Sequence, residues 1–123
     1  MIEWTISQEL RLVRAHVVGR ATPEHFTAYL AALTDAGAAP YRKLFSIVGD
    51  ASVAAEDIPA IAALVLRFAR GAARVGPLAI VVSNQQGNAL ADWFRSLASV
   101  ERPVRVFQSE ATAMAWLDGI APP

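Results

Sequence analysis

The chain has 123 residues, of which 54% are hydrophobic, with 11 basic and 11 acidic side chains and no cysteine. One domain of this length buries roughly two thirds of the surface that its unfolded chain exposes, so it needs neither disulfides nor a structural metal. The absence of cysteine excludes disulfide scaffolds and thiolate metal sites. The balanced charge argues against binding to nucleic acid or anionic membranes, because both kinds of binding depend on an excess of basic residues.

The apolar residues do not form a membrane span. The longest uncharged apolar stretches, residues 58–66 and 75–82, are about half as long as the roughly 20 residues that a spanning helix needs. The first residues place an acid, Glu3, where a signal peptide has its basic region, and no apolar region follows. We therefore expect a cytoplasmic protein.

The first part of the chain predicts a β-hairpin followed by a helix. Apolar and polar residues alternate over residues 2–7, and after a short polar turn the apolar segment 10–18 follows, a pattern typical of paired antiparallel strands. A helix start follows. Thr22 is a typical N-cap, Pro23 suits the first helical position, and the acidic Glu24 is favoured at the positive end of the helix dipole.

The rest of the chain alternates between strands and helices. Apolar runs predict strands at residues 44–48, 78–82 and 103–107. Helical spacing gives four apolar stripes: Phe26, Tyr29, Leu30 and Leu33; Ile61, Leu64, Val65 and Phe68; Leu90, Trp93, Phe94 and Leu97; and Ala113, Trp116, Leu117 and Ile120. The order ββαβαβαβα predicts a single α/β domain with a largely parallel five-stranded sheet, an antiparallel N-terminal hairpin and four helices.

This order and length resemble the SpoIIAA-like family, which includes STAS domains and is related to the CRAL-TRIO lipid-binding fold. The resemblance covers roughly residues 2–118. It is carried by GRATPEH at residues 19–25, LFSIVGD at 44–50 and VRVFQSEATAMAWL at 104–117. None of these segments is a catalytic signature, so the resemblance implies a fold and not an activity.

The resemblance also indicates a departure from the family pattern. STAS anti-sigma antagonists carry a phosphorylatable serine directly after an aspartate at the start of the second helix. The matching dipeptide here is Asp57-Ile58, and Ile58 has no hydroxyl, which implies that this switch is absent and points to the branch described as STAS/SEC14-like. Ser52 in the same loop could replace that serine, although loop serines near helix starts commonly form turns.

Candidates for catalysis are few. A metal site would require His16 and His25 to meet carboxylates such as Asp50 or Glu24, and no short ligand spacing is present. The sequence contains neither a Walker loop nor a G-x-G-x-x-G turn. A catalytic triad would need His16, an aspartate and one of three serines outside any G-x-S-x-G elbow: Ser46, Ser52 or Ser83. We therefore expect no catalytic residue, no metal and no cofactor.

Two loops follow predicted parallel strands, at the edge of the sheet where ligands usually bind. Their polar side chains form a candidate ligand site: Asp50, Ser52, Ser83, Asn84, Gln85 and Asn88. The alternative for the second loop is an ordinary turn in which Asn88 is the cap of the following helix.

The second predicted helix carries two candidate surfaces. Three arginines recur on one face, which fits either a patch for an anionic partner or compensation of the negative helix end: Arg67, Arg70 and Arg74. A second apolar line consists of Ala62, Leu66, Ala69 and Ala73. A helix that is apolar on two sides is either enclosed in the core or partly exposed to a partner. We interpret this line as an interaction surface, first of all for a homodimer.

Two functions fit these observations. The first is a non-enzymatic module that acts through protein–protein contacts and self-associates, without nucleic-acid or membrane partners. The second is a carrier of a small apolar ligand or lipid, as the related CRAL-TRIO fold implies. The carrier predicts an internal cavity of at least roughly 300 Å³.

Overall fold

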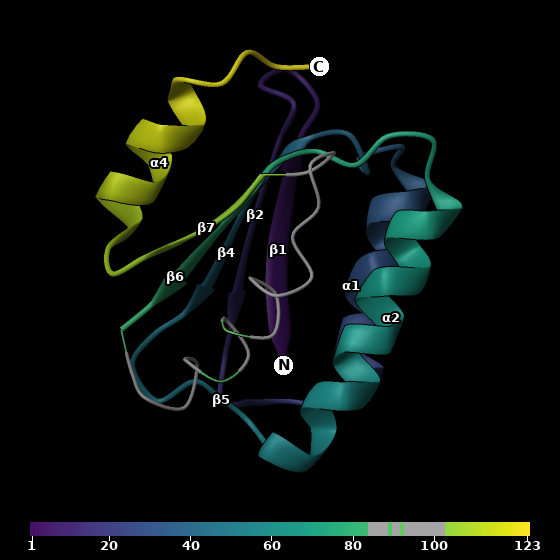
Figure 1. The fold of residues 1–123 in the computed structure, drawn as a ribbon, viewed down its shortest axis with the longest axis vertical. Coiled ribbons are helices and arrows are strands. Elements are labelled where there is room, and N and C mark those ends of the chain that lie inside the picture. The colour runs from purple at the N-terminus through teal and green to yellow at the C-terminus, as the bar shows by residue number, and fades with distance from the viewer. Residues whose placement is uncertain (84–88, 90–91, 93–102) are drawn as a thin grey trace.

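The computed structural model describes residues 1–83, 89, 92 and 103–123. Its centre is a five-stranded sheet with helices α1 and α2 on one face and α4 on the other (Figure 1). The strands of this sheet are β1 (Ile2–Ser7), β2 (Leu12–Val17), β4 (Arg42–Ile47), β6 (Leu78–Val82) and β7 (Val104–Phe107). The helices are α1 (Pro23–Asp35), α2 (Ile58–Gly71) and α4 (Glu110–Asp118).

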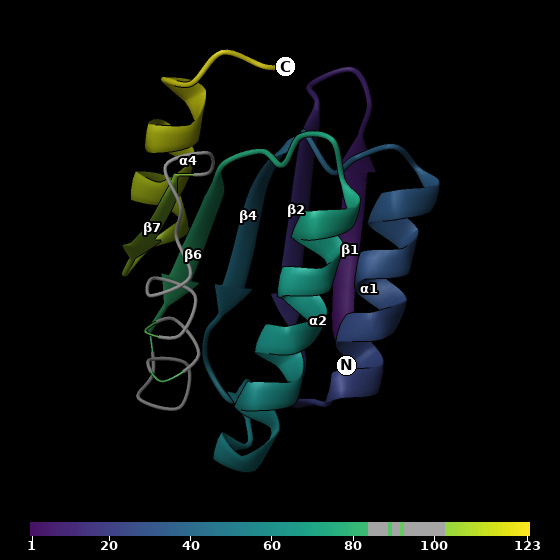
Figure 2. The same ribbon diagram turned by 45° about the vertical axis from the view of Figure 1, so that its right-hand side comes forward.

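The sheet is mixed, with strand order β1-β2-β4-β6-β7. β1 pairs antiparallel with β2, which confirms the predicted hairpin, and the other three strand pairs are parallel. Right-handed crossovers between strands that are added in one direction place their helices on the same face. Accordingly α1 and α2 lie side by side on one face of the sheet (Figure 2).

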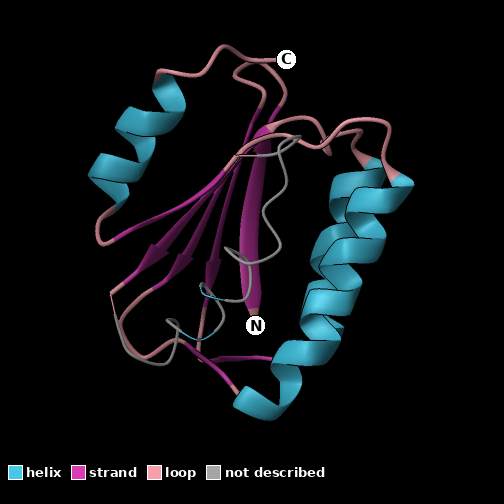
Figure 3. Ribbon diagram, viewed as in Figure 1, coloured by secondary structure: helices cyan, strands magenta, loops and turns pink. Residues whose placement is uncertain are grey.

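A second, two-stranded sheet lies beside the first. In it β3 (Arg20–Ala21) pairs in parallel with β5 (Ser52–Val53), and the short 3-10 helix η1 (Ala55–Asp57) leads from β5 into α2. Figure 3 shows this pair of strands at the end of the molecule where α2 begins. The sequence pattern predicts none of these three elements, because segments of two or three residues are too short for a periodicity.

Several predicted boundaries are wrong. Leu10 and Arg11 belong to the hairpin turn instead of the second strand: Leu10 is exposed, and Arg11 has a φ of 50°. β4 begins at Arg42 instead of Leu44, because two buried charged residues open the strand. The stripe predicted for the third helix lies outside the described residues: Leu90, Trp93, Phe94 and Leu97.

The main core lies between the sheet and the layer of α1 and α2. Phe45 on β4 contacts Phe26 and Tyr29 of α1, with ring centroids 5.6 and 5.7 Å apart. The predicted stripes of both helices face this core. A smaller core between the sheet and α4 contains Leu44 and Leu117.

α1 begins as the sequence predicts, with Thr22 as the N-cap and Pro23 in the first turn. His25 contributes to this cap, because its Nδ1 atom accepts a hydrogen bond of 2.9 Å from the backbone N–H of Thr22. A hydrogen bond from its own backbone N–H lowers the pKa of Glu24 below the ordinary 4.5, and the Thr22 side chain and His25 lower it further. The first turn of α1 is thus stabilised by three side chains.

Candidate functional site

An open groove runs between α1 and α2 on the outer surface of the helix layer, with a volume of about 580 Å³. Its apolar floor is formed by three half-buried side chains: Leu30 on α1 and Leu64 and Phe68 on α2. The groove exists because small residues occupy other positions that line it, Ala31 on α1 and Gly71 on α2 among them. We call this feature the α1–α2 groove.

The C-terminal half of α2 is less buried than its N-terminal half. All three buried residues of the helix come from its first five positions: Ile58, Ile61 and Ala62. The large apolar side chains further along are only half-buried: Leu64, Val65, Leu66 and Phe68. The α1–α2 groove therefore lies where α2 leaves apolar surface in contact with solvent.

A smaller cavity lies under the groove, between the two helices and the sheet. Its volume is about 30 Å³, and Phe26, Lys43 and Phe68 contribute to its lining. A cavity of this size has room for about one or two water molecules. This cavity is too small for a ligand, and the groove above it is open, whereas the carrier hypothesis predicts an internal cavity.

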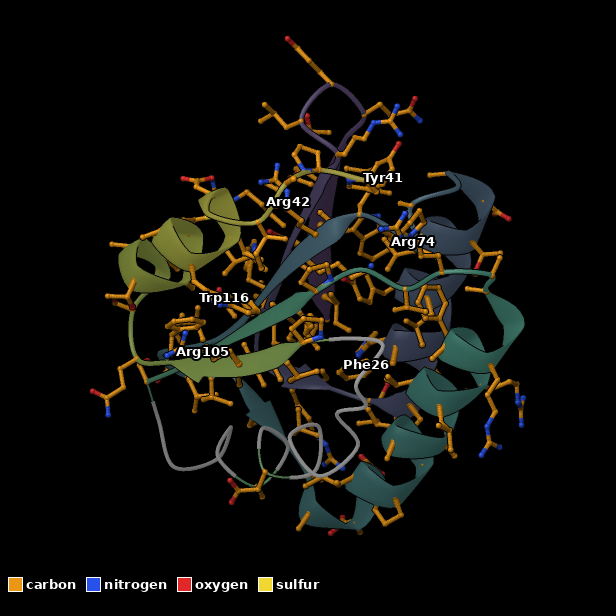
Figure 4. The ribbon with its side chains drawn as sticks, turned by 45° about the horizontal axis from the view of Figure 1, so that its top comes forward. Phe26, Tyr41, Arg42, Arg74, Arg105 and Trp116 are labelled. Atoms are coloured by element: carbon orange, nitrogen blue, oxygen red, sulfur yellow. The ribbon has the colours of Figure 1, made fainter. Side chains whose placement is uncertain are left out.

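Two of the three arginines that the sequence singles out line the α1–α2 groove. These are Arg67 on α2 and Arg74 in the loop after it, whereas Arg70 on the same helix does not line the groove. Figure 4 shows Arg74 on the side of the molecule where Tyr41 lies before β4. Within the described part of the chain, neither groove arginine forms an ion pair. Both exposed guanidinium groups are therefore available to an anionic group.

The predicted apolar interaction line is only partly on the surface. Ala62 is 4% exposed, which corrects its assignment to an interaction surface, because the first turns of α2 pack tightly against the rest of the chain. Leu66 and Ala69 are half-buried and Ala73 is exposed. With about 3.6 residues per turn, Leu66 and Ala69 lie on the flank of α2 that faces away from the groove. Ala73 lines the groove itself.

The two candidate ligand loops begin after β4 and β6, which are parallel neighbours in the sheet. Asp50 is exposed in the turn after β4, and the backbone N–H of Ser83 donates to the carbonyl of Ile47 at 3.4 Å. Ser52 is not a loop residue: it lies in β5, where its N–H donates to Gly19. The other members of this candidate site lie outside the described residues: Asn84, Gln85 and Asn88.

The Asp57-Ile58 dipeptide lies at the start of α2, where the resemblance places it. Ile58 is buried in the main core. The Asp57 carboxylate lies 3.3 Å from the Arg20 guanidinium and caps no backbone N–H of the helix. This arrangement joins β3 to the start of α2.

The structure brings His16 and Ser46 to paired positions on β2 and β4, but it gives each of them another partner. His16 Nε2 lies 3.1 Å from a carboxylate oxygen of Glu3. The Ser46 hydroxyl, in a residue that is 1% exposed, donates to Glu110 on α4 at 3.0 Å. Glu110 also lies 3.6 Å from the Arg14 guanidinium. Sequence reasoning missed Glu110, because only the packing of α4 on the sheet brings it near β2 and β4.

The mixed sheet, its strand order and its two helix layers define an α/β protein of the SpoIIAA-like fold. A solved structure with this fold is an uncharacterised protein of the DUF3478 family from Shewanella loihica PV-4, which matches this chain with a TM-score of 0.66. The two sequences are 17% identical, and the match covers 94% of this chain and 93% of the other. The predicted SpoIIAA-like resemblance is confirmed at the level of the fold.

Comparison with models of known protein families gives no match, and no curated protein matches the sequence. Within the described ranges, no helix combines the length and the hydropathy that crossing a bilayer requires.

Proposed function

We propose that this chain is a non-enzymatic module of the STAS type that acts through protein–protein contacts and associates with itself. The observation that carries the proposal is the half-buried state of the large apolar side chains in the C-terminal half of α2. Apolar surface of this kind is typical of interaction sites when it forms a continuous patch. On association it would contribute about 25 cal/mol for each Å² that is removed from water.

The two flanks of α2 offer different contact surfaces. One flank carries Leu64 and Phe68 over the α1–α2 groove, and the opposite flank carries Leu66 and Ala69. We assign self-association to the second flank, because Leu66 and Ala69 are apolar, and its one charged neighbour, the exposed Arg70, lies one turn after Leu66. The groove flank, which includes Arg67, is better suited to a partner with its own charge.

The side chains with catalytic potential support a non-enzymatic role. Ser46 is buried against Glu110, and His16 pairs with Glu3, so neither points its reactive group at the other. His25 uses Nδ1 to cap α1. Their positions are explained by hydrogen bonds that stabilise the fold.

Sedimentation velocity of the full chain tests self-association. The proposal predicts a dimer at high micromolar concentration that dissociates on dilution. Leu66→Glu should shift the equilibrium toward monomer by at least about tenfold, whereas Ala60→Glu, at an exposed position on another side of the same helix, should not. Circular dichroism shows whether both variants remain folded. A wild-type chain that stays strictly monomeric at high micromolar concentration contradicts self-association.

The second candidate function is a carrier of a small apolar ligand. The volume of the α1–α2 groove, about 580 Å³, lies within the usual range for ligand sites, but the groove is open, whereas the carrier hypothesis predicts an internal cavity. Native mass spectrometry of the protein from its own host tests this candidate. A carrier would retain a small molecule of defined mass, and a bare polypeptide mass would contradict it.

A further inference from the structure

We propose that the α1–α2 groove is the docking site for an acidic amphipathic helix of a partner protein. This inference rests on the proposed function and specifies the partner's chemistry. Three observations carry it: the apolar floor of the groove, its open shape, and the two arginines that line it without any carboxylate.

The dimensions of the groove fit a helix. Its lining extends from Thr27 to Thr34 on α1 and from Leu64 to Gly71 on α2, which is two turns of each helix or roughly 10 Å. Apolar side chains at positions i, i+3 or i+4, and i+7 of a docked helix cover the same length. Leu30, Leu64 and Phe68 would contact that stripe.

The open shape favours a protein segment over a small molecule. Ligand sites usually enclose most of a small ligand's surface, which an open groove does not do. A docked amphipathic helix does not need to be enclosed, because its outer face is polar and stays in water. The small residues Ala31 and Gly71 let a third helix approach the two helices closely.

The charge around the groove favours an acidic partner. Arg67 and Arg74 line it, Arg70 lies on the same helix, and Asp35 at the end of α1 is the acid closest in sequence to the groove's α1 wall. The C-terminal ends of α1 and α2 together contribute about one negative charge. Of the charged groups, only Arg67 and Arg74 belong to the lining, and their two positive charges exceed the partial negative charge of the helix ends, so the lining remains positive.

The test is selection of helical peptides on the full chain. A displayed library of random peptides of about four helical turns is the probe. Selected peptides should be negatively charged, with apolar residues at helical spacing, and their binding should weaken as salt rises. Peptides that are neutral or basic, or an absence of enrichment over an empty support, would overturn the inference.

Matched variants locate the binding site. The double substitution Arg67→Glu and Arg74→Glu should weaken binding of a selected peptide by at least about tenfold, and Arg70→Glu should change it by less than about threefold. Ala31→Trp should block the groove, whereas Ala28→Trp, at an exposed position of α1 outside the groove, should not. Circular dichroism verifies folding. Equal binding to the wild-type chain and to both groove variants would place the site elsewhere.

The outcome separates this inference from self-association. A chain that dimerises but selects no acidic helix retains the proposed function and refutes the groove inference. A chain that remains monomeric yet binds selected acidic helices through Arg67 and Arg74 refutes self-association and supports the groove inference.

Discussion

Two neighbouring charged residues, Arg42 and Lys43, are buried on opposite faces of β4, with exposures of 7% and 2%. Lys43 donates hydrogen bonds to the carbonyl oxygens of Ala39 and Tyr41. The Arg42 guanidinium donates to Leu10 in the hairpin turn and to two carbonyls at the end of α4, those of Leu117 and Ile120. Arg42 therefore joins three segments that are distant in the sequence (Figure 4).

Replacing Arg42 should destabilise the fold. Arg42→Met removes the donor for three carbonyl groups, and we expect the free energy of unfolding to fall by about 3 kcal/mol, measured by urea denaturation. Arg105→Met is the control, because Arg105 is exposed and its contact with the Phe107 ring is worth about 1 kcal/mol or less. Equal losses for the two variants would contradict the role of Arg42.

The first turn of α1 should make stability depend on pH. Because the pKa of Glu24 is lowered in the folded chain, its contribution is present above the ordinary pKa of 4.5 and is lost as the pH falls through the lowered value. Glu24→Gln should lower the melting temperature slightly at neutral pH, and this difference should vanish in acid. Thermal unfolding of both proteins across this pH range measures the effect. A difference that persists unchanged in acid would show that the charge of Glu24 is not its source.

At the scale of elements, the loop between α2 and β6 passes very close to the start of β4. Gly76 lies so near Tyr41 that a Cβ atom there would approach the carbonyl oxygens of Tyr41 and Pro40 to 2.2 and 2.4 Å. The backbone N–H of Gly76 donates to Ala39 at 3.0 Å. This approach fixes the end of the α1–α2 groove, because Ala39 and Pro40 line it.

Any side chain at Gly76 should disrupt this approach. Gly76→Ala should lower the free energy of unfolding by about 3 kcal/mol, because backbone atoms have to move. Gly71→Ala at the end of α2 meets no atom within 4 Å and should stabilise the helix by up to about 1 kcal/mol. Thermal unfolding compares the two. A Gly76→Ala variant as stable as the wild type would contradict the tight contact.

Elements with a clear periodicity could be predicted from the sequence, and elements fixed by distant contacts could not. The alternation of residues 2–7 and the apolar run of β6 predict their strands, and the stripes of α1 and α2 face the core as expected. β4 begins earlier than predicted, because Arg42 and Lys43 resemble surface residues until their distant carbonyl partners are known.

Only the α2 wall of the α1–α2 groove could be predicted from the sequence. The sequence singles out Arg67, Arg74 and Ala73 on or after α2, and all three line the groove. On the opposite wall, Leu30 is predicted only as part of the core stripe and Ala31 carries no signal, since the groove depends on how closely α1 and α2 approach each other. Tertiary packing sets that distance, and no local pattern records it.

At the scale of the whole molecule, the two faces of the sheet differ. The face that carries α1 and α2 holds the main core and the open groove, and α4 covers the opposite face (Figure 1). Beside α4, that opposite face has a polar region with Glu3, Arg14 and His16. Apolar contacts with a partner should therefore form on the α1–α2 side. The polar region around His16 should stay in water.

The most direct test of this account is NMR mapping of the backbone amides as the protein concentration rises from low to high micromolar. The account predicts progressive shifts in the C-terminal half of α2, with Leu66 and Ala69 among the largest, and constant signals at Arg14 and His16 on β2. Spectra that do not change with concentration, or shifts centred on β2 and α4, would contradict the claim that this chain associates through α2.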